Sequence, residues 1–325
     1  MRFALIGAGP IGINIARCAL EKGCELVALV DVDPAKIGRR ASEIVPEAPE
    51  DVFVAADLGA LPETADLVFH ATGSSLELLA DQLNSCLAAR LDVVSTCEEL
   101  AFPWHEHPEL AARLHAHARE SGVRLLGTGI NPGFVMDLLP LVLSAACWEV
   151  RAVSVTRILD ASARRVPFQQ KVGVGITVEA ANDAIARGVF GHVGLPESAW
   201  MISDLLDLGG VRLEQAVEPV VSDETGMVGG LHQDGVLYAE NGLPVVRMRI
   251  EMVAGVDDPH DRIDIDGEPP LSLVVPGGVP GDSGTAAIVV NSALRLGSSP
   301  TGLLCMADLP APYSSRSLRS ETTGA

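Results

Sequence analysis

Two polar segments follow predicted buried strands, and their side chains could carry acid–base chemistry. They read Ser95-Thr96-Cys97-Glu98-Glu99 and Gly127-Thr128-Gly129-Ile130-Asn131-Pro132-Gly133-Phe134. A carboxylate at such a strand end can act as a general base, and the Asn131 amide can orient a ligand. Acidic pairs after strands are also common as helix N-terminal charges, so both interpretations stay open for Glu98 and Glu99.

A glycine-rich turn near the N-terminus predicts the cofactor. Gly7-Ala8-Gly9-Pro10-Ile11-Gly12 follows a predicted strand and opens a predicted helix. Glycines permit the tight turn, and the helix N–H groups then face a pyrophosphate. Asp31 ends the second predicted strand, nineteen residues beyond Gly12, where a carboxylate accepts hydrogen bonds from the adenosine ribose. Together these features predict a dinucleotide site, and Asp31 favours NAD because it repels a ribose phosphate.

Two further segments bear on the cofactor. Ala71-Thr72-Gly73 comes at the end of another predicted strand, and ligands of open parallel sheets gather at the carboxyl ends of strands. An ordinary strand-to-helix turn explains these three residues equally well. Arg39 and Arg40 lie downstream of Asp31 and would tolerate the extra phosphate of NADP. NAD is therefore expected, with NADP as an alternative.

The elements that must position these residues follow a βαβ pattern, which predicts a doubly wound parallel sheet. This N-terminal Rossmann domain is expected over residues 1–131, with residues 284–310 packing back on it through a helix at 284–296. Its predicted strands lie at 2–7, 25–31, 66–72, 92–96 and 123–127, and its predicted helices at 11–22, 76–89 and 108–121.

After Asn131 the pattern changes, and residues 132–283 predict a second, α+β domain that binds substrate and mediates dimerisation. The last residues, 311–325, are rich in Ser, Thr and Arg without periodicity, which predicts a disordered tail. The expected helices of the second domain lie at 133–147, 177–188 and 198–208, and its strands at 150–158, 211–221, 235–238, 245–253 and 271–275.

Composition excludes several classes of partner. The chain has 325 residues, 43 acidic against 23 basic side chains and a formal charge of −20, which repels nucleic acids and anionic membranes. No apolar stretch reaches the length of a membrane span, and glycines interrupt the N-terminal apolar run too early for a signal peptide. The 6 cysteines show no metal-ligand spacing, so we expect reduced thiols, no metal and a cytoplasmic protein.

The two polar segments also carry a resemblance. They are similar to the corresponding runs of 2,4-diaminopentanoate dehydrogenases and native amine dehydrogenases, and the similarity spans almost the whole chain. It continues through Asp160-Ala161-Ser162, Lys171-Val172-Gly173-Val174-Gly175 and Gly191-His192-Val193-Gly194-Leu195. The wider relatives are dihydrodipicolinate reductases, whose nucleotide domain is followed by an α+β domain.

The resemblance implies NAD(P)-dependent, reversible oxidative deamination of a primary amine to a ketone or aldehyde and ammonia, by a homodimer. An ammonium ion has no lone pair to expel a hydride, so a carboxylate must first take its proton. Glu99 is the expected acid–base, with Glu98 as the alternative, and Asn131 would orient the amine or the nicotinamide. Phe134, Arg165 and His192 are expected to line the substrate pocket, although a structural role is an equally plain interpretation of Arg165 and His192.

One departure affects the substrate. Gly278-Val279-Pro280-Gly281-Asp282 lacks a histidine that the resemblance leads us to expect before the Gly-Asp pair. That weakens the case for 2,4-diaminopentanoate and favours a simpler amine. A carbonyl or imine reductase of the dihydrodipicolinate reductase-like group and a non-catalytic dinucleotide-binding sensor are the alternatives, and turnover with an amine separates them from a dehydrogenase.

Overall fold

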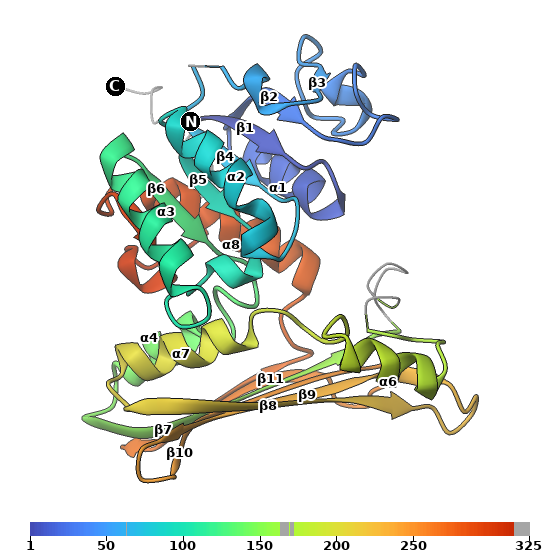
Figure 1. Ribbon diagram of the computed structural model, residues 1–325, viewed down its shortest axis with the longest axis vertical. Helices are drawn as coiled ribbons and strands as arrows, with labels where there is room; N and C mark the ends of the chain where they lie inside the picture. Colours follow the sequence, from blue (N-terminus) through green and yellow to red (C-terminus); the bar gives the residue numbers. More distant parts are fainter. Residues whose placement is uncertain (63, 163–168, 170–171, 315–325) are drawn as a thin grey trace, which may run out of the picture. The chain divides into compact units, whose positions relative to one another are not determined.

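A computed structural model describes residues 1–62, 64–162, 169 and 172–314, and its chain divides into two compact units (Figure 1). The first unit comprises Met1–Phe134 and Pro280–Ala325, and the second comprises Val135–Val279. Arg165 and most of the predicted tail at 311–325 lie outside the described residues. Within the part of the chain that is described, no helix has the length and hydropathy to cross a membrane.

The first unit is built on a seven-stranded sheet in the order β13-β6-β5-β4-β1-β2-β3. Every neighbouring pair of these strands is parallel. The strand order reverses between β1 and β4, which makes their carboxyl ends the switch point where open sheets bind ligands. The strands are β1 (Arg2–Ile6), β2 (Glu25–Val30), β3 (Val54–Ala55), β4 (Leu67–His70), β5 (Asp92–Ser95), β6 (Arg124–Gly127) and β13 (Gly302–Leu304).

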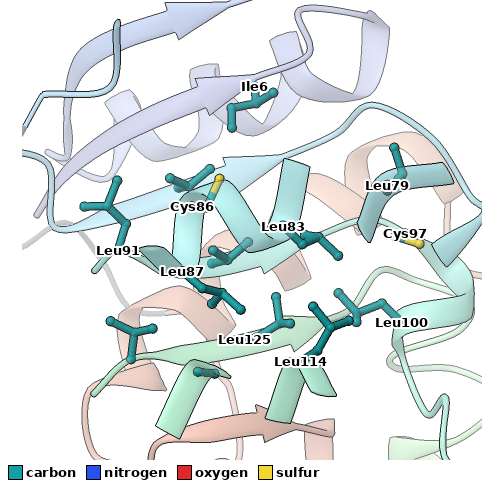
Figure 2. Close-up of a cluster of buried hydrophobic side chains, with 14 of the residues drawn as sticks. Ile6, Leu79, Leu83, Cys86, Leu87, Leu91, Cys97, Leu100, Leu114 and Leu125 are labelled. Carbon is teal, nitrogen blue, oxygen red and sulfur yellow. The ribbon is translucent and has the colours of Figure 1, made fainter. Parts of the chain in front are cut away.

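Helices cover this sheet in two pairs, α2 with α3 and α1 with α8. Alternate residues of the buried strands point to opposite faces, and one buried cluster joins α2 and α3 to residues such as Ile6 and Leu125 (Figure 2). These helices are α1 (Pro10–Glu21), α2 (Leu76–Ala88), α3 (Pro108–Ser121) and α8 (Gly281–Leu296), with 3₁₀ turns η1 (Ala41–Glu43), η2 (Leu58–Ala60), η3 (Glu98–Leu100) and η4 (Met306–Asp308).

The second unit carries a six-stranded sheet in the order β12-β11-β7-β10-β9-β8. Its strands pair antiparallel except for β7 and β10, which are parallel. Helix α7 contacts β8, β9 and β10, and α4 contacts α7, β7 and β11. The elements are β7 (Glu149–Asp160), β8 (Gly210–Val221), β9 (Val228–Ala239), β10 (Pro244–Val253), β11 (His260–Glu268), β12 (Leu271–Pro276), α4 (Leu138–Ser144), α6 (Val178–Ala186) and α7 (Leu195–Leu205).

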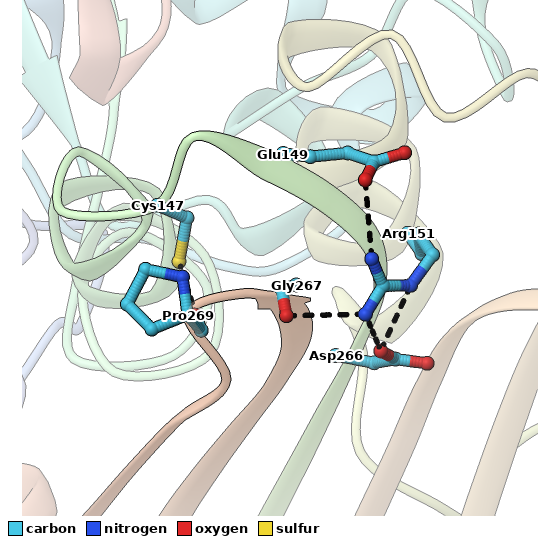
Figure 3. A network of polar contacts seen from close by, with 6 residues as sticks. All are labelled: Cys147, Glu149, Arg151, Asp266, Gly267 and Pro269. Atoms are coloured by element: carbon cyan, nitrogen blue, oxygen red, sulfur yellow. Dashed lines mark hydrogen bonds and ion pairs between the residues drawn. The ribbon is translucent and has the colours of Figure 1, made fainter.

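A polar network fastens the beginning of β7 to the end of β11 (Figure 3). Arg151 donates to Asp266 Oδ1 at 2.7 Å and to the Gly267 carbonyl at 3.1 Å. It also donates to Glu149 Oε2 at 3.1 Å, on its own strand. The β7–β11 register shifts between Asp266 and Gly267, so these bonds tie the two strands together at the irregularity.

The structure confirms the predicted fold class, a doubly wound parallel sheet followed by an α+β unit. It differs from the prediction in several elements, among them the short strands β3 and β13, which were not predicted. The helix predicted at 133–147 is only Leu138–Ser144, because residues 131–137 form turns. The strand predicted at 235–238 extends over Val228–Ala239. Strand His260–Glu268 was not predicted, since charged side chains alternate along it with buried Ile263 and Ile265.

Candidate active site

The glycine turn after β1 brings two chain segments into close contact at the switch point. Gly7 has φ +90°, and a Cβ there would overlap the Ala71 carbonyl oxygen. A Cβ on Gly12 would overlap the Gly7 carbonyl oxygen. Helix α1 begins at Pro10, and its N-cap residue Gly9 has no side chain to cover the first N–H groups. The turn thus leaves the helix N-terminus available to an anionic group such as a pyrophosphate.

Asp31, at the end of β2, is held against the same turn. Its carboxylate accepts from the Ala8 N–H at 2.7 Å, from the Asp33 N–H at 2.8 Å and from Lys36 Nζ at 3.0 Å. Burial alone would raise the pKa of Asp31, but these hydrogen bonds and the Lys36 charge lower it below its ordinary value. Asp31 is therefore an oriented, ionised acceptor beside the glycine turn.

The carboxyl ends of the central strands are aligned by backbone hydrogen bonds that continue the ladder. The Ala71 N–H donates to the Ile6 carbonyl at 2.8 Å, and the Thr96 N–H donates to the His70 carbonyl at 2.9 Å. The Thr128 N–H donates to the Ser95 carbonyl at 2.8 Å. The three segments that the sequence singles out, Ala71–Gly73, Ser95–Glu99 and Gly127–Phe134, therefore leave the sheet side by side.

His70 is a functional candidate that the sequence analysis missed. Its fully buried ring lies with Nδ1 2.9 Å from Ser95 Oγ and Nε2 3.0 Å from both Gln82 Oε1 and Thr72 Oγ1. With Gln82 Oε1 as acceptor, the ring proton is on Nε2 and Nδ1 accepts from Ser95. Burial lowers the pKa of His70 to about 4. A neutral imidazole thus connects the Thr72 segment to the Ser95 segment.

The Glu98–Glu99 pair lies on η3, immediately after β5. The residues on either side, Cys97 and Leu100, are buried in the α2–α3 core cluster (Figure 2). Burial also raises the pKa of the Cys97 thiol to about 12, so that side chain is a neutral anchor. Because both flanking side chains point into the core, the turn leaves the two carboxylates half-buried at its outer side.

One oxygen of Glu99 is fixed by two contacts. Its Oε2 accepts a hydrogen bond of 2.6 Å from the N–H of Leu76, the first residue of α2, and lies 3.3 Å from His107 Nε2. The N-cap residue of α2, Ser75, makes no capping bond with its own side chain, so Glu99 caps this helix from a distant position. Within the residues that the structure describes, no hydrogen bond or ion pair engages the other oxygen, Oε1.

Asn131 lies in the loop that follows β6, and this loop is fastened on two sides. The Thr128 N–H donates to β5 at Ser95, and the Ile130 N–H donates to Thr285 Oγ1 of α8 at 3.3 Å. Asn131 is itself buried, at 9% exposure. The amide is therefore held by a loop anchored to the strand that carries Glu98 and Glu99.

The predicted pocket residues belong to different units. Phe134 is half-buried at the end of the first unit's opening segment, whereas His192 lies in the second unit. The buried Gln233 side chain clamps the His192 backbone, accepting from its N–H at 2.7 Å and donating to its carbonyl at 3.0 Å. These bonds fix the loop that carries the imidazole.

Among the described residues, no three His, Cys, Asp or Glu side chains gather as metal ligands would.

Comparison with known proteins decides the family. The family described as "2,4-diaminopentanoate dehydrogenase C-terminal domain" matches residues 134–323. A 2,4-diaminopentanoate dehydrogenase of Acetoanaerobium sticklandii is 32% identical over 96% of this chain and 94% of its own length. The chain belongs to the 2,4-diaminopentanoate dehydrogenase family. An amine dehydrogenase of Streptomyces virginiae is 29% identical over 52% of this chain and 49% of its own.

A solved structure supports the same fold for the whole chain. The amine dehydrogenase of Mycobacterium smegmatis superposes with a TM-score of 0.84 at 22% identity, covering 98% of both chains. The resemblance expected from the Ser95–Glu99 and Gly127–Phe134 segments is thus confirmed. As a member of the 2,4-diaminopentanoate dehydrogenase family, the protein is a nicotinamide-dependent oxidoreductase of the amine dehydrogenase class.

Proposed function

We propose that this dehydrogenase catalyses reversible oxidative deamination of a primary amine to a ketone or aldehyde and ammonia, with Glu99 as the acid–base. The substrate class is 2,4-diaminopentanoate, by similarity to the named relative, or a simpler amine. The observation that carries the proposal is that the two oxygens of the Glu99 carboxylate have different surroundings. Oε2 is anchored by the Leu76 N–H and by His107, while Oε1 makes no such contact within the described residues.

The residues of the glycine turn fit a dinucleotide, since Gly7 and Gly12 leave no space for a Cβ and Asp31 presents an ionised carboxylate beside them. We propose that Gly7, Gly9, Pro10, Ile11 and Gly12 hold the pyrophosphate, with Ala71, Thr72 and Gly73 alongside, and that Asp31 accepts from the ribose hydroxyls. The cofactor supplies a hydride acceptor when bound.

NAD is the proposed cofactor in preference to NADP. A 2′-phosphate would approach the Asp31 carboxylate, and the nearby arginines are already paired. Arg39 Nε lies 3.1 Å from Glu43 Oε2, and an Arg40 amine donates to the Glu50 carbonyl at 2.6 Å. Lys36 is similarly engaged with Asp31 at 3.0 Å. Binding of a phosphate would have to displace these partners.

In the oxidative direction, Glu99 takes a proton from the substrate ammonium, which gives nitrogen the lone pair needed for loss of hydride from the adjacent carbon. Once that proton has left Glu99, the carboxylate takes a proton from water as the water attacks the substrate iminium, and it gives this proton to the nitrogen. Ammonia then leaves as the carbonyl forms and carries the hydroxyl proton away as ammonium. Asn131 orients the amine or the nicotinamide. Glu98 is the alternative acid–base, because it lies on the same turn.

We propose that the region over 132–283 supplies the substrate pocket, with His192 and Arg165 from this region and Phe134 at its beginning. The same region is proposed to form a homodimer through the face of its sheet that α7 does not cover. Oppositely charged pairs occupy that face, including Arg249 with Asp234 at 3.0 Å and His232 with Glu251 at 3.2 Å. A face that carries both signs can pair with its two-fold copy.

A cytoplasmic location is proposed together with a small-molecule substrate. All 6 cysteines are free, as expected of proteins in reducing compartments. The formal charge of −20 disfavours nucleic acids and anionic membranes as partners.

The test is oxidation of NADH with a panel of ketones and aldehydes that includes 2-amino-4-oxopentanoate, at high ammonium and alkaline pH, with ammonium-free controls. Oxidation that depends on ammonium supports the proposal, and the panel then ranks the substrates. Oxidation of equal rate without ammonium would indicate carbonyl reduction, and an absence of turnover with every compound would indicate a dinucleotide sensor.

A further inference from the structure

One histidine lies directly against the proposed acid–base. His107 immediately precedes α3, and its Nε2 is 3.3 Å from Glu99 Oε2. Its Nδ1 is 3.8 Å from Glu77 Oε1, in the first turn of α2. Within the described residues, the charged groups that contact the ring are Glu99 of η3 and Glu77 of α2. The imidazole therefore stands between two carboxylates, one on each ring nitrogen.

Two of these three side chains are half-buried and the third is exposed. Glu99 and His107 are 22% and 20% exposed, whereas Glu77 is 75% exposed. A neutral imidazole can receive a proton on one nitrogen and release another from the opposite nitrogen. The order Glu99, His107, Glu77 is thus chemically suited to conduct a proton between a half-buried carboxylate and solvent.

The proposed reaction creates the need for such a path. Each oxidative turnover first places the substrate's ammonium proton on Glu99, and the carboxyl group must lose it before it can take a proton from the attacking water. The Leu76 N–H on Oε2 can only donate, so it stabilises the carboxylate but cannot accept this proton. The adjacent His107 nitrogen is able to accept it.

We propose that His107 is a positioning and relay residue that exchanges the Glu99 proton with solvent through Glu77, an inference that rests on the proposed function. The proton on the Glu99 carboxyl moves to His107 Nε2. The Nδ1 proton moves through a bridging water to Glu77, whose Oε1 lies 3.8 Å away, beyond direct hydrogen-bonding distance, and then on to solvent. The imidazole then loses its Nε2 proton and regains one on Nδ1 by exchange with solvent. No electrons are transferred. Over the full cycle two protons enter the ring and two leave it, so that the net result is the transfer of one proton from Glu99 to solvent.

The test compares His107→Ala and His107→Gln with the wild type and with His105→Ala. His105→Ala is the matched control, because His105 lies two residues away and its side chain is exposed. Glutamine fills similar space and retains a hydrogen-bond donor, but it cannot relay a proton. Steady-state rates are measured with NAD and 2,4-diaminopentanoate, or with the most active amine of the panel. NADH fluorescence checks that each variant folds and binds cofactor.

We expect kcat of both His107 variants to fall about 100-fold, the lower range for a positioned proton-transfer group, with KM for NAD unchanged. Added imidazole should restore the rate of His107→Ala in a saturable manner, and His105→Ala should match the wild type. Wild-type kcat in His107→Gln, or a failure of imidazole to restore His107→Ala, would overturn the relay while leaving amine oxidation standing. A wild type that oxidises no amine would overturn the proposed function and the relay with it.

Discussion

Glu99 is assigned two separable roles, and two substitutions separate them. In Glu99→Gln the amide oxygen can still accept from Leu76 N–H, but the side chain cannot take a proton at neutral pH. Glu99→Ala removes both roles. Because a positioned acid–base contributes about 10²- to 10⁴-fold, kcat should fall by that range in both variants, whereas NADH affinity should stay close to wild type.

The stabilities of the two variants should differ. A helix cap contributes about 1 kcal/mol, and a carboxylate at a helix N-terminus adds about 0.3–1 kcal/mol. The free energy of unfolding should therefore fall by about 1–2 kcal/mol in Glu99→Ala and by less than about 1 kcal/mol in Glu99→Gln. For units of this size, each kcal/mol lowers the melting temperature by about 2–4 °C. Calorimetry with NADH titration measures both quantities. Wild-type kcat in Glu99→Gln would refute the catalytic assignment and transfer it to Glu98, and equal melting temperatures in the two variants would refute the cap.

Three further predictions concern the supporting residues. Asp31→Asn removes the ionised acceptor beside Ala8. In fluorescence titrations it should weaken NADH binding about 10-fold and NADPH binding less. An equal loss for both cofactors would contradict the proposal that Asp31 accepts hydrogen bonds from the ribose hydroxyls. His70 has a folded pKa of about 4 and an unfolded pKa near 6.5, so the unfolded state binds the extra proton. Stability should therefore fall as pH drops from 6.5 to 4, by about 2.5 kcal/mol at pH 4.5. His70→Gln should flatten that part of a urea-unfolding pH series, and an unchanged slope would contradict this assignment. Arg157 and Asp261 are both 1% exposed and pair at 2.8 Å, so Arg157→Leu should destabilise the second unit by about 3–5 kcal/mol in urea unfolding, whereas a loss under about 1 kcal/mol would show that the pair is dispensable.

Much of the nucleotide-binding unit could be predicted because its signals are local. The Gly7–Gly12 turn and Asp31 each follow an apolar strand directly, and a parallel sheet brings successive strand ends to one edge whatever the details of packing. Strand His260–Glu268 was missed for a physical reason: only one of its faces is buried, so the charged residues of the other face hide the alternation of Ile263 and Ile265.

The contacts that give the site its chemistry could not be predicted, because they join residues far apart in the chain. Glu99 caps a helix that begins 23 residues earlier, and His70 meets Ser95 only because β4 and β5 are neighbours. His107 follows His105 and Glu106 and precedes Pro108, in a segment that resembles an ordinary helix start. The one feature of the sequence that could have drawn attention to His70 is its position directly after the apolar run Leu67–Phe69, where burial of the strand buries the histidine as well.

The fate of ammonium nitrogen tests the central claim most directly. The wild-type protein is incubated with NADH, the most active ketone of the panel and ¹⁵N-labelled ammonium, and the product is analysed by mass spectrometry. Our account predicts a primary amine that carries ¹⁵N in amounts equal to the NADH consumed. An alcohol without ¹⁵N, formed with the same consumption of NADH, would contradict it.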